Sequence, residues 1–211
     1  MSVFLFPHPF YAIADTLGRP ELSYPDLVAH ICAGGAKLLQ LRVKGRSTRD
    51  FLTIAQQART ICQRHGCLFI VNDRVDVALA VDADGVHVGQ DDLPLGAARR
   101  VLGAGKVIGV STHDSEQALA AARGGADYIG FGPVFGTQTK ATGYTARGLE
   151  QLREIRRLVR VPIVAIGGIT AERAPLTLAA GADAVAMISE IVLAPDVKAR
   201  VAAVVRALAG R

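Results

Sequence analysis

Residues 124–131 read Gly-Gly-Ala-Asp-Tyr-Ile-Gly-Phe: two glycines, a small residue and an acid, followed by a short apolar run. The same beginning recurs at Gly34-Gly35-Ala36 and at Gly181-Ala182-Asp183, with a weaker copy at Ala83-Asp84-Gly85. Each copy stands between a helical pattern and the apolar run that follows it. The chain therefore carries traces of a repeated unit in which a helix leads into a strand.

Outward from these copies, short apolar runs alternate with helical patterns along the whole chain. The runs are rich in β-branched residues and apolar on both faces, as is typical of buried parallel strands. We expect strands at 10–14, 37–41, 68–71, 85–88, 107–110, 128–131, 163–166 and 184–187. We expect helices at 24–33, 48–65, 74–81, 95–102, 115–123, 149–159, 171–180 and 197–208.

Eight such units in this length predict an α/β fold, a (β/α)8 TIM barrel with one domain over residues 1–211. The active site is then expected at the C-terminal ends of the strands. A doubly wound open sheet is the alternative. It would need a Gly-rich dinucleotide loop after the first strand, where the chain has Asp15-Thr16-Leu17-Gly18 instead.

Local capping signals support these boundaries. Ser47 or Thr48 is expected to cap the second helix, and Thr170 the seventh. Glycines stand where four helices should end, and each is expected to supply a left-handed C-cap: Gly66, Gly103, Gly124 and Gly181.

Composition limits the possible classes of protein. The chain has 211 residues, half of them hydrophobic, which is enough for one full core. Its apolar stretches are short and interrupted, so no membrane span is expected. Met1 to Phe10 lacks a basic region and a cleavage site and contains two prolines, which indicates a lead-in to the first strand rather than a signal peptide.

The net charge of +5 comes largely from one arginine-rich helix pattern around residues 153–160. No aromatic residues interleave with these arginines, so we interpret them as a solvated face and expect no nucleic-acid partner. Cys32, Cys62 and Cys67 have no metal-ligand spacing and are expected to be packed free thiols in a reducing cytoplasm. The sequence assigns no oligomeric state.

Polar strings follow the strands. After the second strand comes Gln40-Leu41-Arg42-Val43-Lys44, in which Gln40, Arg42 and Lys44 alternate and should point to one side. A guanidinium and an ammonium group are suited to binding phosphate oxygens. An ordinary solvated basic loop is the alternative interpretation.

The third and fourth strands are followed by acids: Asn72-Asp73 after one, and Asp92, preceded by Gln90, after the other. Two carboxylates from adjacent strands could bind one Mg2+, which prefers hard oxygen ligands and usually shares substrate phosphates. Asp73 alone could equally be a helix cap. His87 is expected to be a hydrogen-bonded core residue.

Further donors follow the later strands. Ser111 ends the fifth strand, and Thr137-Gln138-Thr139-Lys140 follows the sixth after a loop shaped by Gly and Pro. Gly167-Gly168 after the seventh strand would let a phosphate approach the backbone at a helix N-terminus. Ile188-Ser189 closes the eighth. Together these strings predict a magnesium–diphosphate site.

The strings, in this order and spacing, resemble the thiamine phosphate synthase (thiamin-phosphate pyrophosphorylase) family from Tyr11 to about Ile191. The resemblance includes Gln-Leu-Arg-x-Lys at 40–44, Asn-Asp-Arg at 72–74, Asp-Gly-Val-His-x-Gly-Gln-x-Asp at 84–92, Gly-Val-Ser at 109–111, Gly-Pro-Val-Phe-x-Thr-x-Thr-Lys at 132–140 and Ala-Ile-Gly-Gly-Ile at 165–169.

The resemblance implies a transferase that joins hydroxymethylpyrimidine diphosphate to a (carboxylated) hydroxyethylthiazole phosphate. It implies that Arg42, Lys44, Ser111 and Lys140 hold the diphosphate as catalytic groups. It also implies that Asp73 and Asp92 bind Mg2+. The remaining substrate contacts fall into two groups. Gln40, Asn72, Thr137 and Thr139 would contact the pyrimidine or position its neighbours, and Gly168, Ile188 and Ser189 would receive the thiazole phosphate. Leu41, Val43 and Gln138 are further substrate-binding residues in the same strings.

Two other functions stay open. A thiazole tautomerase relative shares the barrel and the phosphate site, but it has a His in the turn where this chain has Pro133. A non-catalytic ligand-binding paralogue would be favoured by loss of Asp73, Asp92 or Lys140, and all three are present.

Overall fold

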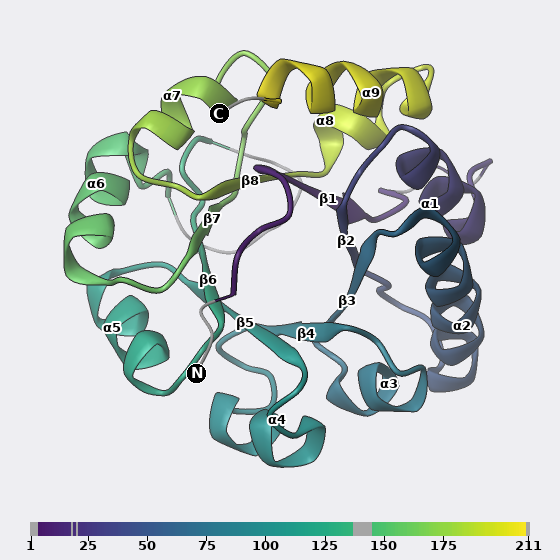
Figure 1. The fold of residues 1–211 in the computed structure, drawn as a ribbon, viewed down its shortest axis with the longest axis horizontal. Coiled ribbons are helices and arrows are strands. Elements are labelled where there is room, and N and C mark those ends of the chain that lie inside the picture. Colours follow the sequence, from purple (N-terminus) through teal and green to yellow (C-terminus); the bar gives the residue numbers. More distant parts are fainter. Residues whose placement is uncertain (1–3, 18, 20, 137–144, 210–211) are drawn as a thin grey trace.

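A computed structural model describes residues 4–17, 19, 21–136 and 145–209 of the chain. Its eight strands form a closed barrel in the order β1 to β8, and every neighbouring pair is parallel. The helices surround the barrel on the outside (Figure 1). The predicted (β/α)8 barrel is confirmed.

The strands are β1 (Phe10–Ala14), β2 (Leu38–Leu41), β3 (Leu68–Asn72), β4 (Gly85–Val88), β5 (Val107–Thr112), β6 (Tyr128–Phe131), β7 (Ile163–Ala165) and β8 (Ala184–Met187). The helices are α1 (Tyr24–Ala33), α2 (Thr48–His65), α3 (Val75–Ala80), α4 (Leu95–Leu102), α5 (Ser115–Arg123), α6 (Gly148–Leu158), α7 (Ala174–Ala179), α8 (Ser189–Val192) and α9 (Val197–Leu208).

Alternate residues of each strand face two different apolar layers. In β1, Phe10, Ala12 and Ala14 belong to the layer between strands and helices, whereas Tyr11 and Ile13 belong to the barrel interior. Successive strand side chains point to opposite faces, so both faces of a closed parallel barrel are buried. This explains why the strand sequences are apolar without strict alternation.

Aromatic side chains close the N-terminal end of the barrel. The rings of Phe4 and Phe6, which precede β1, lie 5.7 and 5.3 Å from the ring of Tyr128 inside the barrel. Gly109 leaves the room that the Tyr128 ring occupies, since a Cβ there would lie 2.1 Å from a ring carbon. Figure 1 shows this N-terminal segment crossing the barrel opening.

Most of the predicted boundaries are confirmed to within one or two residues. The predicted helix caps are confirmed only in part. The hydroxyl of Ser47 accepts the backbone N–H of Asp50 at the start of α2, and Gly66 has the left-handed conformation at its end. The prediction for Gly124 is wrong: its φ is −71°, and the positive φ falls on Gly125.

The seventh helix begins later than predicted, and a short eighth helix was not predicted. α7 starts at Ala174 with Pro175 in its first turn, where a residue without an N–H is tolerated. Thr170 is therefore not its N-cap; its hydroxyl accepts the N–H of Arg173 in the preceding turn. α8 has only four residues, too few for a helical period to be detected.

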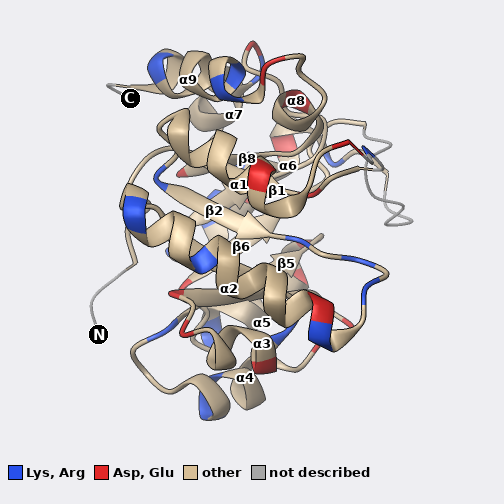
Figure 2. Ribbon diagram, turned by 90° about the vertical axis from the view of Figure 1, so that its right-hand side faces the viewer, with Lys and Arg blue, Asp and Glu red and all other residues tan. Residues whose placement is uncertain are grey.

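Charged residues are spread over the outer helices and loops (Figure 2). On α6, Arg153 pairs with Glu150 at 2.9 Å and Arg156 pairs with Asp183 at 3.0 Å. These pairs agree with a solvated helix face. Among the described residues, none of the helices combines the length and the apolar character that crossing a bilayer requires.

Candidate active site

A cavity lies at the C-terminal ends of the strands, where the barrel fold places active sites. Its lining brings together residues from β2, β3, β5 and the segments after β7 and β8. Seven of the predicted site residues line it: Gln40, Arg42, Asn72, Ser111, Gly168, Ile188 and Ser189.

Other predicted residues lie elsewhere. The side chains of Leu41 and Val43 are buried in the layer between the strands and the helices, so only their backbone could face a substrate. The Lys44 side chain is 55% exposed and pairs with Asp73, a neighbour of the cavity-lining Asn72. The predicted contacts Thr137, Gln138, Thr139 and Lys140 lie outside the described residues.

A continuous chain of hydrogen bonds crosses the barrel interior at the base of the cavity. The side-chain amide of Gln40 donates to the hydroxyl of Tyr11 at 3.0 Å, and that hydroxyl lies 3.0 Å from the hydroxyl of Tyr128. The Tyr128 hydroxyl is 3.0 Å from Nδ1 of His87, whose Nε2 is 2.9 Å from Oγ of Ser111. The chain thus joins two predicted substrate contacts on β2 and β5.

Gln40 sets the direction of these hydrogen bonds. Since its amide donates to Tyr11, the chain is satisfied when Tyr11 donates to Tyr128 and Tyr128 donates to Nδ1 of His87. In this arrangement the proton of His87 lies on Nε2, which donates to Ser111. The Ser111 hydroxyl keeps its own proton to donate to a ligand in the cavity.

Burial keeps both tyrosines protonated, and it confirms the expectation for His87. Desolvation raises the pKa of Tyr11 and of Tyr128 above the ordinary phenol value. His87 is also buried, and each ring nitrogen faces a hydroxyl group. His87 is therefore a hydrogen-bonded core histidine, as expected, and it is also a link between the barrel interior and Ser111.

Arg42 and Lys44, which follow β2, are each paired with an acid. Arg42 forms an ion pair with Asp15, which follows β1, and both side chains are largely buried. Lys44 forms an ion pair with Asp73, which follows β3. A buried guanidinium that keeps one fixed partner is held in place, and its remaining N–H groups stay available to an anion.

Asp73 and Asp92 come together from the ends of β3 and β4. The pKa of Asp92 is raised, first by desolvation and then by its neighbour Asp73. Asp73 has a left-handed backbone with φ of 64°, a conformation that non-glycine residues seldom adopt outside constrained sites. Oδ2 of Asp92 accepts the backbone N–H of Gly89 at 2.7 Å, which fixes the carboxylate.

This pair of carboxylates fits Mg2+. The ion usually binds one or two protein carboxylates and takes its other ligands from water and substrate phosphates. The two acids lie side by side, and their mutual repulsion raises the pKa of Asp92. A bound cation would neutralise this repulsion, and the carboxylate oxygens would be its ligands. The predicted ligands therefore agree with the predicted metal.

The glycine pair after β7 is packed tightly against the loop after β6. Gly168 has φ of +60°, and a Cβ there would lie 2.5 Å from the carbonyl oxygen of Gly136. The guanidinium of Arg173 donates to the Gly168 carbonyl at 2.7 Å and lies 4.8 Å from the ring centroid of Phe135. Since α7 begins only at Ala174, the glycines are not at its N-terminus, contrary to the prediction.

Glu190 follows Ser189 at the other side of this region. Its carboxylate accepts the backbone N–H of Ala171 at 3.2 Å and lies 3.7 Å from a guanidinium nitrogen of Arg200. The negative charge of Glu190 is therefore balanced by the backbone N–H of Ala171 and by Arg200.

Several cavity residues were not predicted from the sequence. Tyr11 lines the cavity from β1, and Nδ1 of His113 donates to the carbonyl of Gly132 at 2.6 Å. Tyr128 lies below the cavity. Tyr11 occupies the interior-facing position of an otherwise apolar strand, which is the one signal that could have suggested it.

A cavity lined by several polar side chains at the C-terminal ends of the strands of a closed parallel barrel is the arrangement of (β/α)8-barrel enzymes. The sequence matches the family model of thiamine monophosphate synthase over residues 10–191. The chain belongs to this family.

Individual relatives agree with this membership. The chain is 49% identical over 189 residues to the thiamine-phosphate synthase of Methanospirillum hungatei, covering 90% of this chain and 92% of that protein. It is 50% identical over 192 residues to the thiamine-phosphate synthase of Methanocella arvoryzae, covering 91% of each. The thiamine phosphate pyrophosphorylase from Pyrococcus furiosus has a similar structure, with a TM-score of 0.84 at 39% identity over 95% of this chain and 96% of that one.

Proposed function

We propose that this protein joins hydroxymethylpyrimidine diphosphate to hydroxyethylthiazole phosphate, in its plain or carboxylated form. The products are thiamine phosphate and diphosphate, with CO2 when the thiazole is carboxylated. The observation that carries the proposal is the membership of the thiamine monophosphate synthase family over residues 10–191. A cytoplasmic location is part of the proposal, supported by three cysteines that form no disulfide.

The pyrimidine diphosphate is proposed to bind between β2, β3 and β5. Gln40 and Asn72 would contact the pyrimidine, together with the threonines at 137 and 139. Arg42, Lys44, Ser111 and Lys140 would hold the diphosphate. The placement of Gln40, Arg42, Asn72 and Ser111 around one cavity supports these roles.

The reaction is proposed to be dissociative. An electron-rich aminopyrimidine can stabilise a cation at its methylene carbon, so the C–O bond to diphosphate can break before the thiazole nitrogen attacks. The protein then has to stabilise the departing charge and hold the nucleophile in line. No covalent nucleophile or general base is needed. Ser111 contributes a donor whose direction is set by His87.

Asp73 and Asp92 are proposed to hold Mg2+. When bound, the ion would neutralise charge that develops on the leaving diphosphate. Asp73 also pairs with Lys44, so the same carboxylate positions a cation of the diphosphate site.

The thiazole phosphate is proposed to bind on the opposite side of the cavity, at Gly168, Ile188 and Ser189. All three line the cavity, which supports a shared role. The carboxylate of Glu190 is engaged by Arg200 and by the backbone of Ala171, so it does not oppose a phosphate there. This arrangement would place the thiazole ring between the two phosphate groups.

One assay separates this function from its alternatives. The purified protein is incubated with both substrates and Mg2+, and thiamine phosphate and diphosphate are measured. The proposal predicts equal amounts of both. Isomerised thiazole without coupling would indicate a tautomerase, and binding of both substrates without product would indicate a non-catalytic paralogue.

A further inference from the structure

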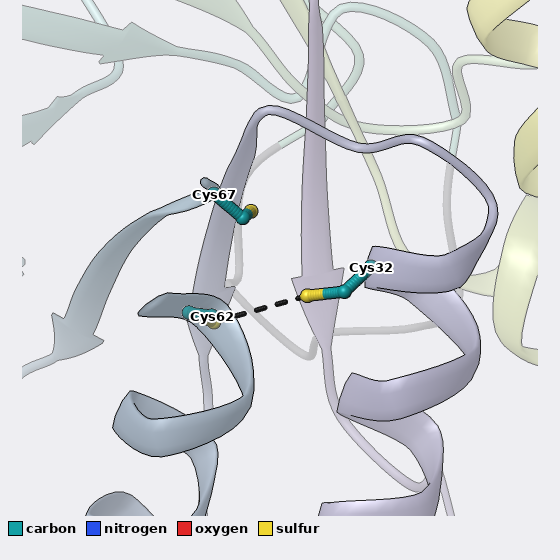
Figure 3. Close-up of side chains that lie close together, drawn as sticks. All are labelled: Cys32, Cys62 and Cys67. Atoms are coloured by element: carbon teal, nitrogen blue, oxygen red, sulfur yellow. Dashed lines mark hydrogen bonds between the residues drawn. The ribbon is translucent and has the colours of Figure 1, made fainter. Parts of the chain in front are cut away.

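Three cysteine thiols converge at the end of the barrel opposite the cavity. Cys32 comes from the last turn of α1, Cys62 from the last turn of α2, and Cys67 directly precedes β3. Their sulfur atoms all lie within 4.8 Å of one another, and all three residues are buried. Figure 3 shows the three side chains directed towards the space between them.

A tight turn brings two of these cysteines together. Gly66 takes the left-handed conformation after α2, its N–H donates to the carbonyl of Gln63, and the N–H of Cys67 donates to the carbonyl of Cys62 at 3.0 Å. This pattern reverses the chain at a helix end and sets residue 67 beside residue 62. Helix α1 lies beside α2 and adds Cys32 (Figure 1).

The spacing of the sulfur atoms is close to what a metal ion bound by three thiolates requires. A metal–thiolate bond of about 2.3 Å places three sulfurs of a trigonal site about 4.0 Å apart. The sulfurs of Cys32 and Cys62 are 3.9 Å apart. A disulfide bond would need the same two atoms to approach to about 2.0 Å.

The donor set indicates which kind of ion would bind. Among the described residues, no histidine or carboxylate joins the three sulfurs. Structural Zn2+ sites are almost always four-coordinate, whereas soft thiolate ligands also select Cu(I).

We propose that Cys32, Cys62 and Cys67 bind one soft monovalent metal ion, Cu(I), through their three sulfur atoms, at a site separate from the catalytic cavity. Binding releases the thiol protons to solvent and leaves the oxidation state of the metal and of the sulfurs unchanged. The site would tie the ends of α1 and α2 to the start of β3. It is independent of the proposed synthase activity.

The binding experiment uses the full chain, reduced and kept free of oxygen. Cu(I) is added in competition with a coloured Cu(I) chelator, and copper retained by the protein is counted. The proposal predicts one equivalent per chain and an X-ray absorption spectrum with three sulfur neighbours at about 2.3 Å. Failure to retain copper, or a first shell without sulfur, would overturn it, as would tighter binding of Zn2+ than of Cu(I).

Matched variants test the ligands. Cys32→Ser and Cys62→Ser should each weaken Cu(I) binding at least tenfold, since even changes to groups behind metal ligands cost roughly 10- to 100-fold. Ala58→Ser, at a buried position of the same helix α2, should retain copper. Unchanged affinity in Cys62→Ser would contradict the proposal, and so would a Cys32–Cys62 disulfide in protein purified without reductant. If a variant does not fold, the X-ray absorption spectrum of the unmodified protein still shows whether sulfur atoms bind the copper.

Discussion

The Oγ of Ser111 lies 2.9 Å from Nε2 of His87, and this contact connects a residue of the cavity to the interior of the barrel. Behind His87 the hydrogen bonds continue through Tyr128 and Tyr11 to Gln40. Two substrate contacts on opposite sides of the barrel are thus oriented by one buried chain. A substitution deep in the interior should therefore affect catalysis.

Tyr128→Phe tests this relationship. The change removes the hydroxyl that links Tyr11 to His87, so the direction of the Ser111 donor is no longer fixed. We expect kcat/KM to fall about tenfold, which corresponds to the loss of about 1.4 kcal/mol, in the range of one hydrogen bond. Steady-state kinetics would measure it. Tyr24→Phe, in the outer layer, is the control and should keep full activity; equal rates for the two variants would contradict the role of the chain.

Arg42→Ala should reduce turnover by roughly 100-fold or more, the scale for loss of one electrostatic donor to a developing charge. The same loss is expected for Lys140→Ala. Single-turnover measurements would separate the chemical step from product release. Arg153→Ala, on the exposed face of α6, is the matched control. Near-normal turnover of Arg42→Ala would remove this residue from the diphosphate site.

Gly168→Ala should weaken binding of the thiazole phosphate. The new Cβ would lie 2.5 Å from the Gly136 carbonyl oxygen, at a backbone position with φ of +60°. We expect KM for the thiazole phosphate to rise about tenfold or more, and by more than KM for the pyrimidine diphosphate, because Gly168 itself lines the thiazole side of the cavity. Gly136→Ala is the control, since a Cβ there meets no atom within 4 Å. An equal rise in both KM values would contradict a specific role of Gly168 on the thiazole side.

Asp92→Asn should weaken the response to Mg2+, and EDTA should abolish the activity of the unmodified protein. The amide keeps an oxygen that can accept the Gly89 N–H but loses the charge that a hard cation needs. Activity measured against Mg2+ concentration would show a rightward shift for Asp92→Asn and none for the adjacent Asp91→Asn. Full activity in EDTA would exclude the metal from the mechanism.

The raised pKa of Asp92 also predicts a pH dependence. Because the folded protein holds this proton more tightly than the unfolded chain, the metal-free protein loses stability as the pH rises from 3.8 through the raised value. The loss then persists at neutral pH, and Mg2+ should reverse it. Carboxyl NMR titration should show the pKa of Asp92 falling when Mg2+ is added. At neutral pH without metal, Asp92→Asn should therefore unfold at a higher temperature than the unmodified protein; equal or lower values would contradict this.

The sequence predicts the barrel and much of the cavity because both depend on local patterns. Buried parallel strands are short and apolar, and polar residues just beyond their C-terminal ends must come to one edge. Gln40, Arg42, Asn72 and Ser111 were predicted on this basis, and all four line the cavity. The roles assigned to them stay predictions until the kinetics are measured.

Other features depend on contacts between distant segments and leave no local pattern. Cys32 is thirty positions before Cys62, and only the packing of α1 on α2 brings their sulfurs together. Tyr11 and Tyr128 stand in apolar strands, and the sequence does not show that their hydroxyls lie 3.0 Å apart inside the barrel. The prediction of a left-handed Gly124 was wrong because the sequence does not distinguish the two glycines of the pair. Gly125 has the left-handed conformation instead.

Phe4 and Phe6, packed beneath Tyr128, give the barrel a floor. Because this end is closed by aromatic rings, the cavity at the C-terminal ends of the strands is the shared route by which both substrates enter and both products leave.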